Sequence, residues 1–338
     1  MSRLCFSLLA LTLSSLATGI FYAPAGAQKR SAKVSISYTS FNMPAALVWI
    51  AKEGRLFSKY GLEDELVFIP GGTTSMAALV AGSIDFAQLT GSPGAYAYLG
   101  GAEVVYLAAS MDSMSYQIIV RPEIRVAPDL RGRRLGISRF GSSPDVAARM
   151  ALRKLGVNPD DVSIIQTGSS PERLAALLAG KVDATVLNAP FDRVAQKHNL
   201  KILADTSKMG IPYFDTGIVT TRRFVRANEE IVWQFMKAYV EAIKVFKTDK
   251  SYAKTVASRY ARINDLEAVE EAYNYFVGKI PRYPYPTLTG MQTVLDEIAR
   301  SNPRAQNVKP DDIVDARFVK ELHLTGFIDN LYKESVRK

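Results

Sequence analysis

Short apolar runs alternate with amphipathic stretches along most of the chain, which indicates strands that are each followed by a helix. Residues 33–39 alternate apolar and polar side chains and predict a strand, and residues 44–53 predict a helix that begins at Pro44. The predicted strands are residues 33–39, 62–69, 84–89, 104–109, 116–120, 134–138, 162–166, 182–187, 202–204 and 216–220. Helices that closely follow strands indicate mainly parallel sheets with crossover helices, so we predict an α/β fold.

One helix–strand unit occurs twice in the sequence. The first copy spans residues 71–87, the second spans residues 168–184, and the two run in register at a constant offset. In each copy the helix ends at a glycine, Gly82 or Gly180, the residue best suited to a left-handed position after a helix. A duplicated unit predicts two similar lobes, each of which offers half of a ligand site at the carboxyl ends of its strands.

The lobes are predicted to be discontinuous in sequence. Residues 33–120 form the first part of lobe 1, and residues 121–214 form lobe 2 after a crossing that is rich in proline. Residues 215–338 return to lobe 1 and add C-terminal helices, because apolar side chains recur there at helical spacing, as in residues 232–246.

The N-terminal residues 1–27 have the three parts of a cleavable signal peptide. Arg3 supplies the positive start, an apolar run follows, and Ala25-Gly26-Ala27 forms a cleavage site before Gln28. The alternative, a retained membrane anchor, is disfavoured because the apolar run is too short to span a bilayer. The only cysteine, Cys5, lies in this segment, so the mature chain has no disulfide, no thiolate metal site and no cysteine nucleophile.

Composition and charge narrow the class of ligand. The chain of 338 residues is 48% hydrophobic and 22% charged, values typical of a globular protein that is exported or intracellular. Its formal net charge of +9 is scattered, and the densest cluster, Arg131 with Arg133 and Arg134, is predicted to lie in a turn. A nucleic-acid partner would need a continuous basic stripe, so we expect none, and we expect a mild preference for small anions.

Sequence motifs of catalysis or cofactor binding are missing or incomplete. His198 and His323 have no neighbours at the spacing of metal ligands, and no phosphate-binding glycine motif occurs. Ser251 and Lys254 match the spacing of serine β-lactam enzymes, but the two companion motifs of that class are missing. Asp85 and Asp183 lie at the amino ends of strands, where a turn or capping role is expected. We therefore predict a protein without metal, cofactor or enzymatic activity.

The candidate ligand site lies at helix starts that follow strands in both lobes. Ser92, Ser143 and Ser170 each precede a proline, and free N–H groups at such helix starts favour an anion. The loop from Arg139 to Ser143 offers a guanidinium and two hydroxyls, although an arginine on a solvated loop could equally serve no ligand. The candidate ligand-binding residues are Ser40, Phe41, Asn42, Gly72, Thr73, Thr74, Thr90, Ser92, Arg139, Phe140, Gly141, Ser142, Ser143, Asn188 and Phe214. Among the aromatic residues, Phe41 and Phe214 are the preferred candidates for stacking on a flat ligand.

Four motifs, at residues 54–62, 78–85, 129–137 and 179–184, carry a family resemblance. Together with the signal peptide they resemble the exported solute-binding proteins of ABC importers, in the branch that serves sulfonates, taurine, nitrate and thiamine-pyrimidine precursors. The resemblance implies a class II periplasmic-binding-protein fold, in which two lobes joined by two crossing strands close on a ligand.

The same resemblance implies a periplasmic monomer that captures a small polar or anionic solute, such as a sulfonate, carboxylate, nitrate or pyrimidine-like compound, and delivers it to a membrane permease. One alternative is an enzyme on the same scaffold. However, related desulfinases and pyrimidine synthases depend on cysteines that the mature chain lacks. A second alternative is a ligand-sensing partner of a membrane receptor.

Overall fold

The computed structural model describes residues 31–333. The predicted signal peptide and its cleavage point between Ala27 and Gln28 therefore lie outside the described residues. Between residues 31 and 333, no helix has both the length and the apolar character needed to cross a bilayer.

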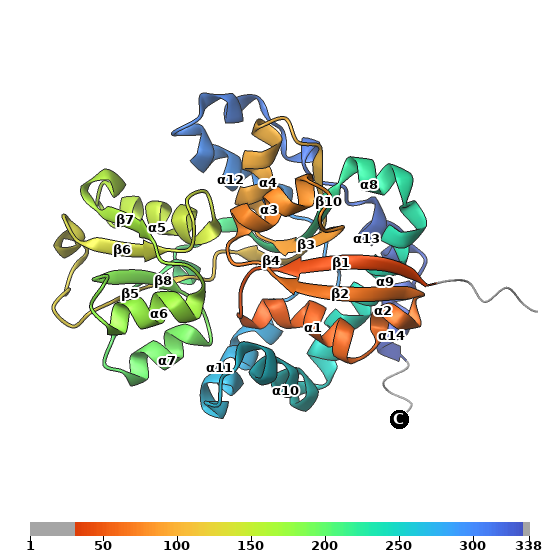
Figure 1. The fold of residues 1–338 in the computed structure, drawn as a ribbon, viewed down its shortest axis with the longest axis horizontal. Helices are drawn as coiled ribbons and strands as arrows, with labels where there is room; N and C mark the ends of the chain where they lie inside the picture. The colour runs from red at the N-terminus through yellow and green to blue at the C-terminus, as the bar shows by residue number, and fades with distance from the viewer. Residues whose placement is uncertain (1–30, 334–338) are drawn as a thin grey trace, which may run out of the picture. The chain divides into compact units, whose positions relative to one another are not determined.

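Two five-stranded sheets form the framework, with strand orders β2-β1-β3-β10-β4 and β7-β6-β8-β5-β9 (Figure 1). In each sheet four strands run in the same direction, and the fourth in spatial order, β10 or β5, runs antiparallel to both of its neighbours. The strands are β1 (Ala32–Tyr38), β2 (Leu62–Phe68), β3 (Phe86–Leu89), β4 (Val104–Ser113), β5 (Gln117–Val120), β6 (Arg134–Ile137), β7 (Ser163–Gln166), β8 (Ala184–Leu187), β9 (Lys201–Asp205) and β10 (Pro212–Thr221). We call the first sheet with its helices the first lobe and the second sheet with its helices the second lobe.

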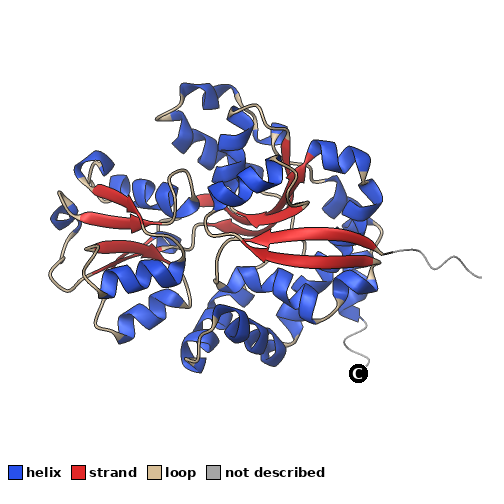
Figure 2. Cartoon of the chain, viewed as in Figure 1, coloured by secondary structure: helices blue, strands red, loops and turns tan. Residues whose placement is uncertain are grey.

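Helices flank both sheets (Figure 2). The second lobe has α5 (Ser143–Lys154), α6 (Ser170–Leu178) and α7 (Phe191–Lys197). The other helices are α1 (Ala46–Glu53), α2 (Leu56–Lys59), α3 (Gly72–Val80), α4 (Gly91–Leu99), α8 (Arg222–Ala227), α9 (Glu229–Thr248), α10 (Lys250–Ala261), α11 (Leu266–Val277), α12 (Leu288–Ala299), α13 (Arg317–Leu324) and α14 (Phe327–Lys333). The predicted mixed α/β fold with mainly parallel sheets is confirmed, and the chain beyond Arg222 is helical as expected.

The repeated unit occupies equivalent places in the two sheets, as α3 followed by β3 and as α6 followed by β8. Both helices end at a glycine of positive φ, +76° at Gly82 and +68° at Gly180. The two aspartates that follow also play the same part. Asp85 Oδ2 accepts a hydrogen bond of 2.8 Å from the backbone N–H of Ser35, and Asp183 Oδ2 accepts one of 2.9 Å from that of Arg134. Both carboxylates are structural, as expected, but they bind the start of a neighbouring strand about fifty residues away and not the local backbone of a turn or cap.

The first crossing between the sheets lies earlier in the chain than predicted. The strand expected at residues 116–120 was assigned to the first lobe, but β5 pairs with β8 and β9 in the second sheet. The chain therefore crosses between Ser113 and Gln117. It crosses back where β10 begins at Pro212, which pairs with Ser113 of β4. The pattern of apolar residues predicts a strand but does not say which of two sheets receives it.

Two apolar clusters pack against the opposite faces of the sheets. One joins α1 and α9 of the first lobe to α6 and α7 of the second, with Trp49 and Phe235 fully buried. The other joins α3, α4 and α12 to α5, with Tyr106 and Phe214 fully buried. The two apolar clusters cover the faces of both sheets. The helices that follow the strands begin at the ends of the strands, where the two lobes meet.

Candidate functional site

A cavity of about 50 Å³ lies between the two lobes. The first lobe and its crossing strand contribute Thr39, Ser40, Asn42, Ala45, Gly71, Gly72, Gln88, Leu89, Thr90 and Thr216 to its wall. The second lobe contributes Ser138, Ser142, Ser143, Pro144, Ser170, Arg173 and Asn188, and Tyr116 comes from the first crossing. The wall is rich in hydroxyls and amides, and Arg173 is its only charged side chain among the described residues.

Helix starts from both lobes reach this cavity. Gly72 begins α3, Thr90 precedes α4, Ser143 begins α5 and Ser170 begins α6. No side chain caps the starts of α3, α4 or α5 by a hydrogen bond within the described residues. Their first N–H groups and the positive ends of their helix dipoles are therefore available to an anion in the cavity.

Arg173 lies in the first turn of α6 and is only 3% exposed. Its Nε donates to the carbonyl oxygen of Val186 at 3.0 Å, and Nη1 donates to that of Gly168 at 2.7 Å. Nη2 donates to Ser170 Oγ at 3.0 Å. Nη1 and Nη2 each carry a second N–H that no other described hydrogen bond uses. These contacts fix the guanidinium at the cavity wall and leave it able to donate again.

The charge of Arg173 has no paired carboxylate. Within residues 31–333, no Asp or Glu oxygen lies within 4.0 Å of a guanidinium nitrogen of Arg173, so Arg173 forms no ion pair. Glu172 is next in sequence, but its carboxylate accepts hydrogen bonds from Ser169 N at 2.6 Å and Ser169 Oγ at 2.8 Å. Burial lowers the pKa of Arg173 to about 10, while Tyr116 and Glu172 act in the opposite direction. Arg173 is therefore cationic at neutral pH, and a buried cation without a partner attracts an anion.

Tyr116 adds a neutral hydroxyl to the wall. It is 5% exposed, and burial holds the pKa of its hydroxyl well above the ordinary value of 10.0, with a further increase from Asp215. The nearby hydroxyls of Tyr213 and Ser143 lie 2.9 Å apart and join the second crossing strand to α5. At neutral pH both tyrosines keep their protons, so neither adds negative charge to the site.

The structure brings about half of the predicted site residues to the cavity. Those that line it are Ser40, Asn42, Gly72, Thr90, Ser142, Ser143 and Asn188. Asn188 is 2% exposed, and its side-chain amide makes no hydrogen bond with residues 31–333. Those that do not line it are Phe41, Thr73, Thr74, Ser92, Arg139, Phe140, Gly141 and Phe214.

The two preferred aromatic candidates, Phe41 and Phe214, pack away from the cavity. Phe41 packs against Phe68, with ring centroids 4.4 Å apart. Phe214 is fully buried against Tyr106, with centroids 4.6 Å apart. Ser92 is also fully buried and lies outside the cavity wall. Phe41 and Ser92 follow strand ends, whereas Phe214 lies within β10, which begins at Pro212, two residues before it.

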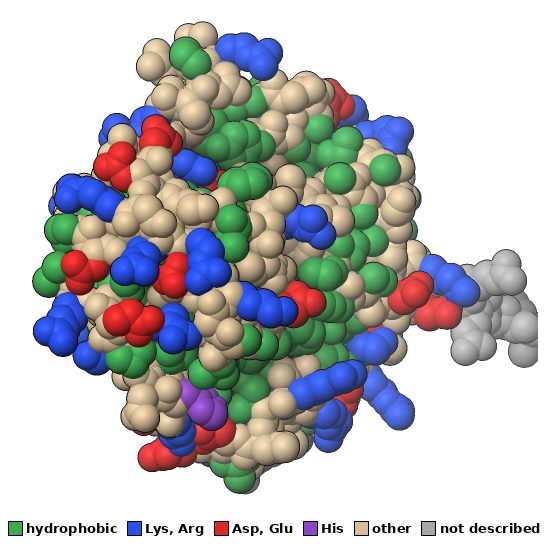
Figure 3. Space-filling view, turned by 60° about the vertical axis from the view of Figure 1, so that its left-hand side comes forward, with side chains coloured by type: hydrophobic (Ala, Val, Ile, Leu, Met, Phe, Trp, Pro, Cys, Tyr) green, Lys and Arg blue, Asp and Glu red, His purple; other side chains and the backbone are tan. Residues whose placement is uncertain are grey.

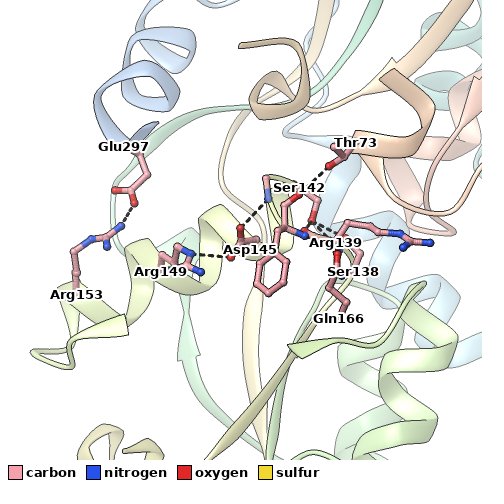
Figure 4. A network of polar contacts seen from close by, with 11 residues as sticks. Thr73, Ser138, Arg139, Ser142, Asp145, Arg149, Arg153, Gln166 and Glu297 are labelled. Atoms are coloured by element: carbon pink, nitrogen blue, oxygen red, sulfur yellow. Dashed lines mark hydrogen bonds and ion pairs between the residues drawn. The ribbon is translucent and has the colours of Figure 1, made fainter. Parts of the chain in front are cut away.

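The loop between β6 and α5 contributes Ser138 and Ser142 to the cavity wall, whereas Arg139, Phe140 and Gly141 lie outside it. Figure 4 shows the polar contacts of this loop. Arg139 and Phe140 are exposed, and in Figure 4 the guanidinium of Arg139 points away from Ser142. Thr73, which is exposed on α3, donates from Oγ1 to the carbonyl oxygen of Phe140 at 3.1 Å. The aliphatic part of Arg139 lies against Gly71, where an added Cβ would come within 2.7 Å of Cγ. This loop therefore contacts the first lobe directly.

Arg173 is the most important residue that sequence reasoning missed. An arginine within a helix ordinarily suggests a solvated face, so its type alone gave no signal. The internal repeat contained one: at the constant offset of the two copies, Arg173 aligns with Ser75. Ser75 is fully buried and its Oγ lies 2.6 Å from Ser37 Oγ. A charged residue in one copy, aligned with a small buried serine in the other, could have indicated which copy contributes a charge to the candidate site.

No group of three or more His, Cys, Asp or Glu side chains in residues 31–333 is arranged to hold a metal ion. On the face in Figure 3, basic side chains are interspersed with acidic ones and form no continuous stripe.

The fold and the cavity define a two-lobed protein of the periplasmic-binding-protein class. The chain belongs to the NMT1/THI5-like family, whose model matches residues 42–250. A relative in Brucella abortus (strain 2308), named as a binding protein, is 23% identical over 78% of this chain and 82% of its own length. A relative in Brachyspira hyodysenteriae, named as an ABC transporter periplasmic binding protein, is 25% identical over 59% of this chain and 61% of its own length.

A solved structure supports the fold assignment. The alkanesulfonate-binding protein SsuA from Xanthomonas axonopodis pv. citri, bound to MOPS, superimposes with a TM-score of 0.68 at 21% identity. The match covers 85% of this chain and 99% of SsuA. The family resemblance expected from the sequence is confirmed by the family model, and the structural match agrees with the expected fold.

Proposed function

We propose that the protein captures a compact anionic solute between its lobes and delivers it to the permease of an ABC importer. The single observation that carries the anionic character is Arg173, a buried cation that lines the interlobe cavity without a carboxylate partner. The uncapped starts of α3, α4 and α5 act in the same direction. Of the predicted site residues in the wall, Asn188 and Ser143 would supply hydrogen bonds to the anion.

The size of the cavity favours a small solute. A volume of about 50 Å³ has room for roughly three to five water molecules. Short-chain sulfonates, small carboxylates and nitrate fit this limit, and their negative charge would pair with Arg173. A neutral pyrimidine would leave the guanidinium unpaired in a desolvated cavity, which costs free energy. We therefore favour anions over the pyrimidine-like ligands of the wider family.

Export to the periplasm is part of the proposal. The predicted signal peptide ends at Ala27, and relatives of this chain are named as periplasmic binding proteins. A chain purified from a periplasmic extract would then begin at Gln28, and intact-mass measurement would detect this.

We also propose that the protein acts as a monomer, because a single chain supplies residues to the whole cavity wall. Light scattering after gel filtration would test this.

A thermal-shift screen tests the ligand class. The panel would contain methanesulfonate, taurine, nitrate, acetate, phosphate and an uncharged pyrimidine, and each compound that raises the melting temperature would be titrated by calorimetry. We expect at least one compact anion to bind with a micromolar dissociation constant, a free energy of about −8 kcal/mol. Stabilisation by the pyrimidine alone would contradict the proposal.

An uptake assay separates delivery from sensing, the alternative role. A strain without the gene would be tested for uptake of the anion that binds, with wild-type and Arg173→Met chains restored in parallel. Transport predicts that only the wild-type chain restores uptake. Normal uptake without the gene would instead favour a sensing role.

A further inference from the structure

The charges around the cavity limit the charge that a ligand can carry. In the described part of the chain, Arg173 is the only charged residue of the wall, and no carboxylate lines it. The buried carboxyl groups of Asp145, Asp192 and Asp215 all lie outside the wall. Asp145 forms an ion pair of 2.8 Å with Arg149, and burial raises the pKa of Asp192 and of Asp215, which disfavours their anionic forms. One negative charge on a ligand therefore finds a partner, whereas a positive charge finds none.

The part of the wall that the first lobe and its crossing strand supply is uncharged but able to form hydrogen bonds. It contains four side-chain hydroxyls that make no hydrogen bond with residues 31–333, those of Thr39, Ser40, Thr90 and Thr216. A hydroxyl can both donate and accept, so this part of the wall can solvate a neutral polar group. An apolar group in the same place would leave these hydroxyls without partners in a desolvated cavity, which costs free energy.

Gln88 adds an unpaired acceptor to the same part of the wall. It is 3% exposed, and its Nε2 donates to the carbonyl oxygen of Pro44 at 3.0 Å. Its Oε1 is buried and makes no hydrogen bond with residues 31–333. A hydroxyl on a ligand could donate to this oxygen and satisfy it. An ammonium group could also donate, but the amide is neutral and does not offset the cost of burying a full positive charge.

We infer that the ligand is a monoanion whose far end carries an uncharged hydrogen-bonding group, as in a short hydroxyalkanesulfonate or hydroxycarboxylate. The anionic end pairs with Arg173, and the hydroxyl contacts Gln88 and the neighbouring hydroxyls of the wall. The small volume of the cavity, about 50 Å³, favours a short chain between the two groups. This inference rests on the proposed function and narrows its compact anions to one chemical class, from which zwitterions are excluded.

A series of three sulfonates of equal chain length tests the nature of the far end. Isethionate ends in a hydroxyl, propane-1-sulfonate in a methyl group and taurine in an ammonium group, while the sulfonate and the two-carbon spacer stay the same. Calorimetry on the full chain should find isethionate bound most tightly. We expect propane-1-sulfonate to bind about tenfold more weakly, the loss of one hydrogen bond, and taurine at least about a hundredfold more weakly.

A second series separates the choice of the far end from the choice of the anionic group. It replaces the sulfonate by a carboxylate, in 3-hydroxypropionate, butyrate and β-alanine. The same order of hydroxyl, methyl and ammonium is expected in whichever series binds, because the far end meets the same wall.

Gln88→Glu tests the site directly, because it places a carboxylate in the wall with almost no change in shape. We expect taurine to bind this variant at least about tenfold more tightly than it binds wild type, and isethionate about tenfold more weakly. Gln306→Glu is the matched control, since Gln306 is exposed and lies outside the wall. Gln88→Met keeps the volume but removes the acceptor, so the preference for isethionate over propane-1-sulfonate should fall to about threefold or less. Melting temperatures would verify that each variant folds.

The outcomes distinguish this inference from the proposed function. If the wild-type chain binds no anion of either series or of the wider panel, the proposed function fails and the inference fails with it. If taurine or propane-1-sulfonate binds as tightly as isethionate, or their carboxylate counterparts as tightly as 3-hydroxypropionate, the inference alone is contradicted. Binding of nitrate or methanesulfonate with none of the longer compounds would contradict it too, because these anions have no second polar group. Unchanged affinities in both Gln88→Glu and Gln88→Met would show that the far end does not reach Gln88, which would also overturn it.

Discussion

Ser115 Oγ donates a hydrogen bond of 2.6 Å to Asp215 Oδ2 and so links the two segments that cross between the lobes. Asp215 is 2% exposed, and burial raises its pKa to about 7, although the bond from Ser115 acts in the opposite direction. Its neighbour in sequence, Thr216, lines the cavity, as does Tyr116 next to Ser115. A titratable carboxyl therefore lies within the hinge and directly behind the ligand site.

We predict that Asp215 makes the stability of the protein depend on pH. Its pKa is about 7 when folded and near the ordinary 3.8 when unfolded, so the folded state holds the proton more tightly. The stability that it contributes is complete below pH ~4 and is lost as the pH rises to about 7. Asparagine does not titrate, so the Asp215→Asn variant does not lose stability in this pH range for this reason. Urea unfolding of both chains at pH 5, 6 and 7 should show the variant gaining relative to wild type, and parallel profiles would contradict the assignment.

Arg173→Met should reduce the affinity for a compact anion about a hundredfold, because a charge-assisted hydrogen bond in a desolvated site is lost. Arg139→Ala is the matched control, since Arg139 is exposed and does not line the cavity. The sequence made Arg139 a candidate anion ligand, with a solvated arginine as the equal alternative, and the ligand role would predict at least a tenfold loss for that variant. Calorimetry on both variants decides between the two arginines. The structure predicts a small effect for Arg139→Ala.

An ion-pair cluster between α7 and α11, outside the cavity wall, should affect closure. Lys197 on α7 of the second lobe contacts Asp265 at 2.7 Å and Glu267 at 2.8 Å, beside α11. Lys197→Glu replaces this attraction by repulsion, so we expect a more open average conformation in small-angle scattering and severalfold weaker anion binding. Lys208→Glu is the control, because Lys208 contacts Asp205 within its own lobe at 3.8 Å. Equal effects of the two reversals would show that net charge alone is responsible.

Phe214→Ala should destabilise the fold by about 3–5 kcal/mol, the usual cost of removing a fully buried aromatic ring. Phe140→Ala serves as the comparison, since Phe140 is 50% exposed and should contribute less than about 0.5 kcal/mol. Urea unfolding measures both values. A ligand-stacking role for Phe214 would instead predict a large loss of affinity with little loss of stability.

The duplicated sequence unit predicted most of the architecture. Its glycines end the helix in both copies, because helix ends obey short-range rules. Its aspartates also have equivalent roles, but each binds a strand about fifty residues away, which the local sequence does not specify. The sheet that receives β5 could not be predicted in this way, because that choice depends on pairing with β8 and β9. Sequence pattern specifies an element, whereas long-range contacts specify its partners.

The sequence predicted where the candidate site lies, but only some of the residues that form it. Helix starts that follow strands in both lobes identified Asn42, Ser142 and Asn188 at the cavity wall. Phe41 was misplaced because an aromatic after a strand end can turn either to the cavity or to the core. Arg173 was missed because its burial depends on carbonyl groups that belong to other segments of the second lobe.

A crystal structure of the protein with methanesulfonate, or with the strongest anion of the screen, tests the central claim most directly. The account predicts the anion between the lobes, with an oxygen about 3 Å from Nη1 or Nη2 of Arg173. An anion bound outside the cavity, or a cavity in which Arg173 makes no contact with the solute, would contradict it.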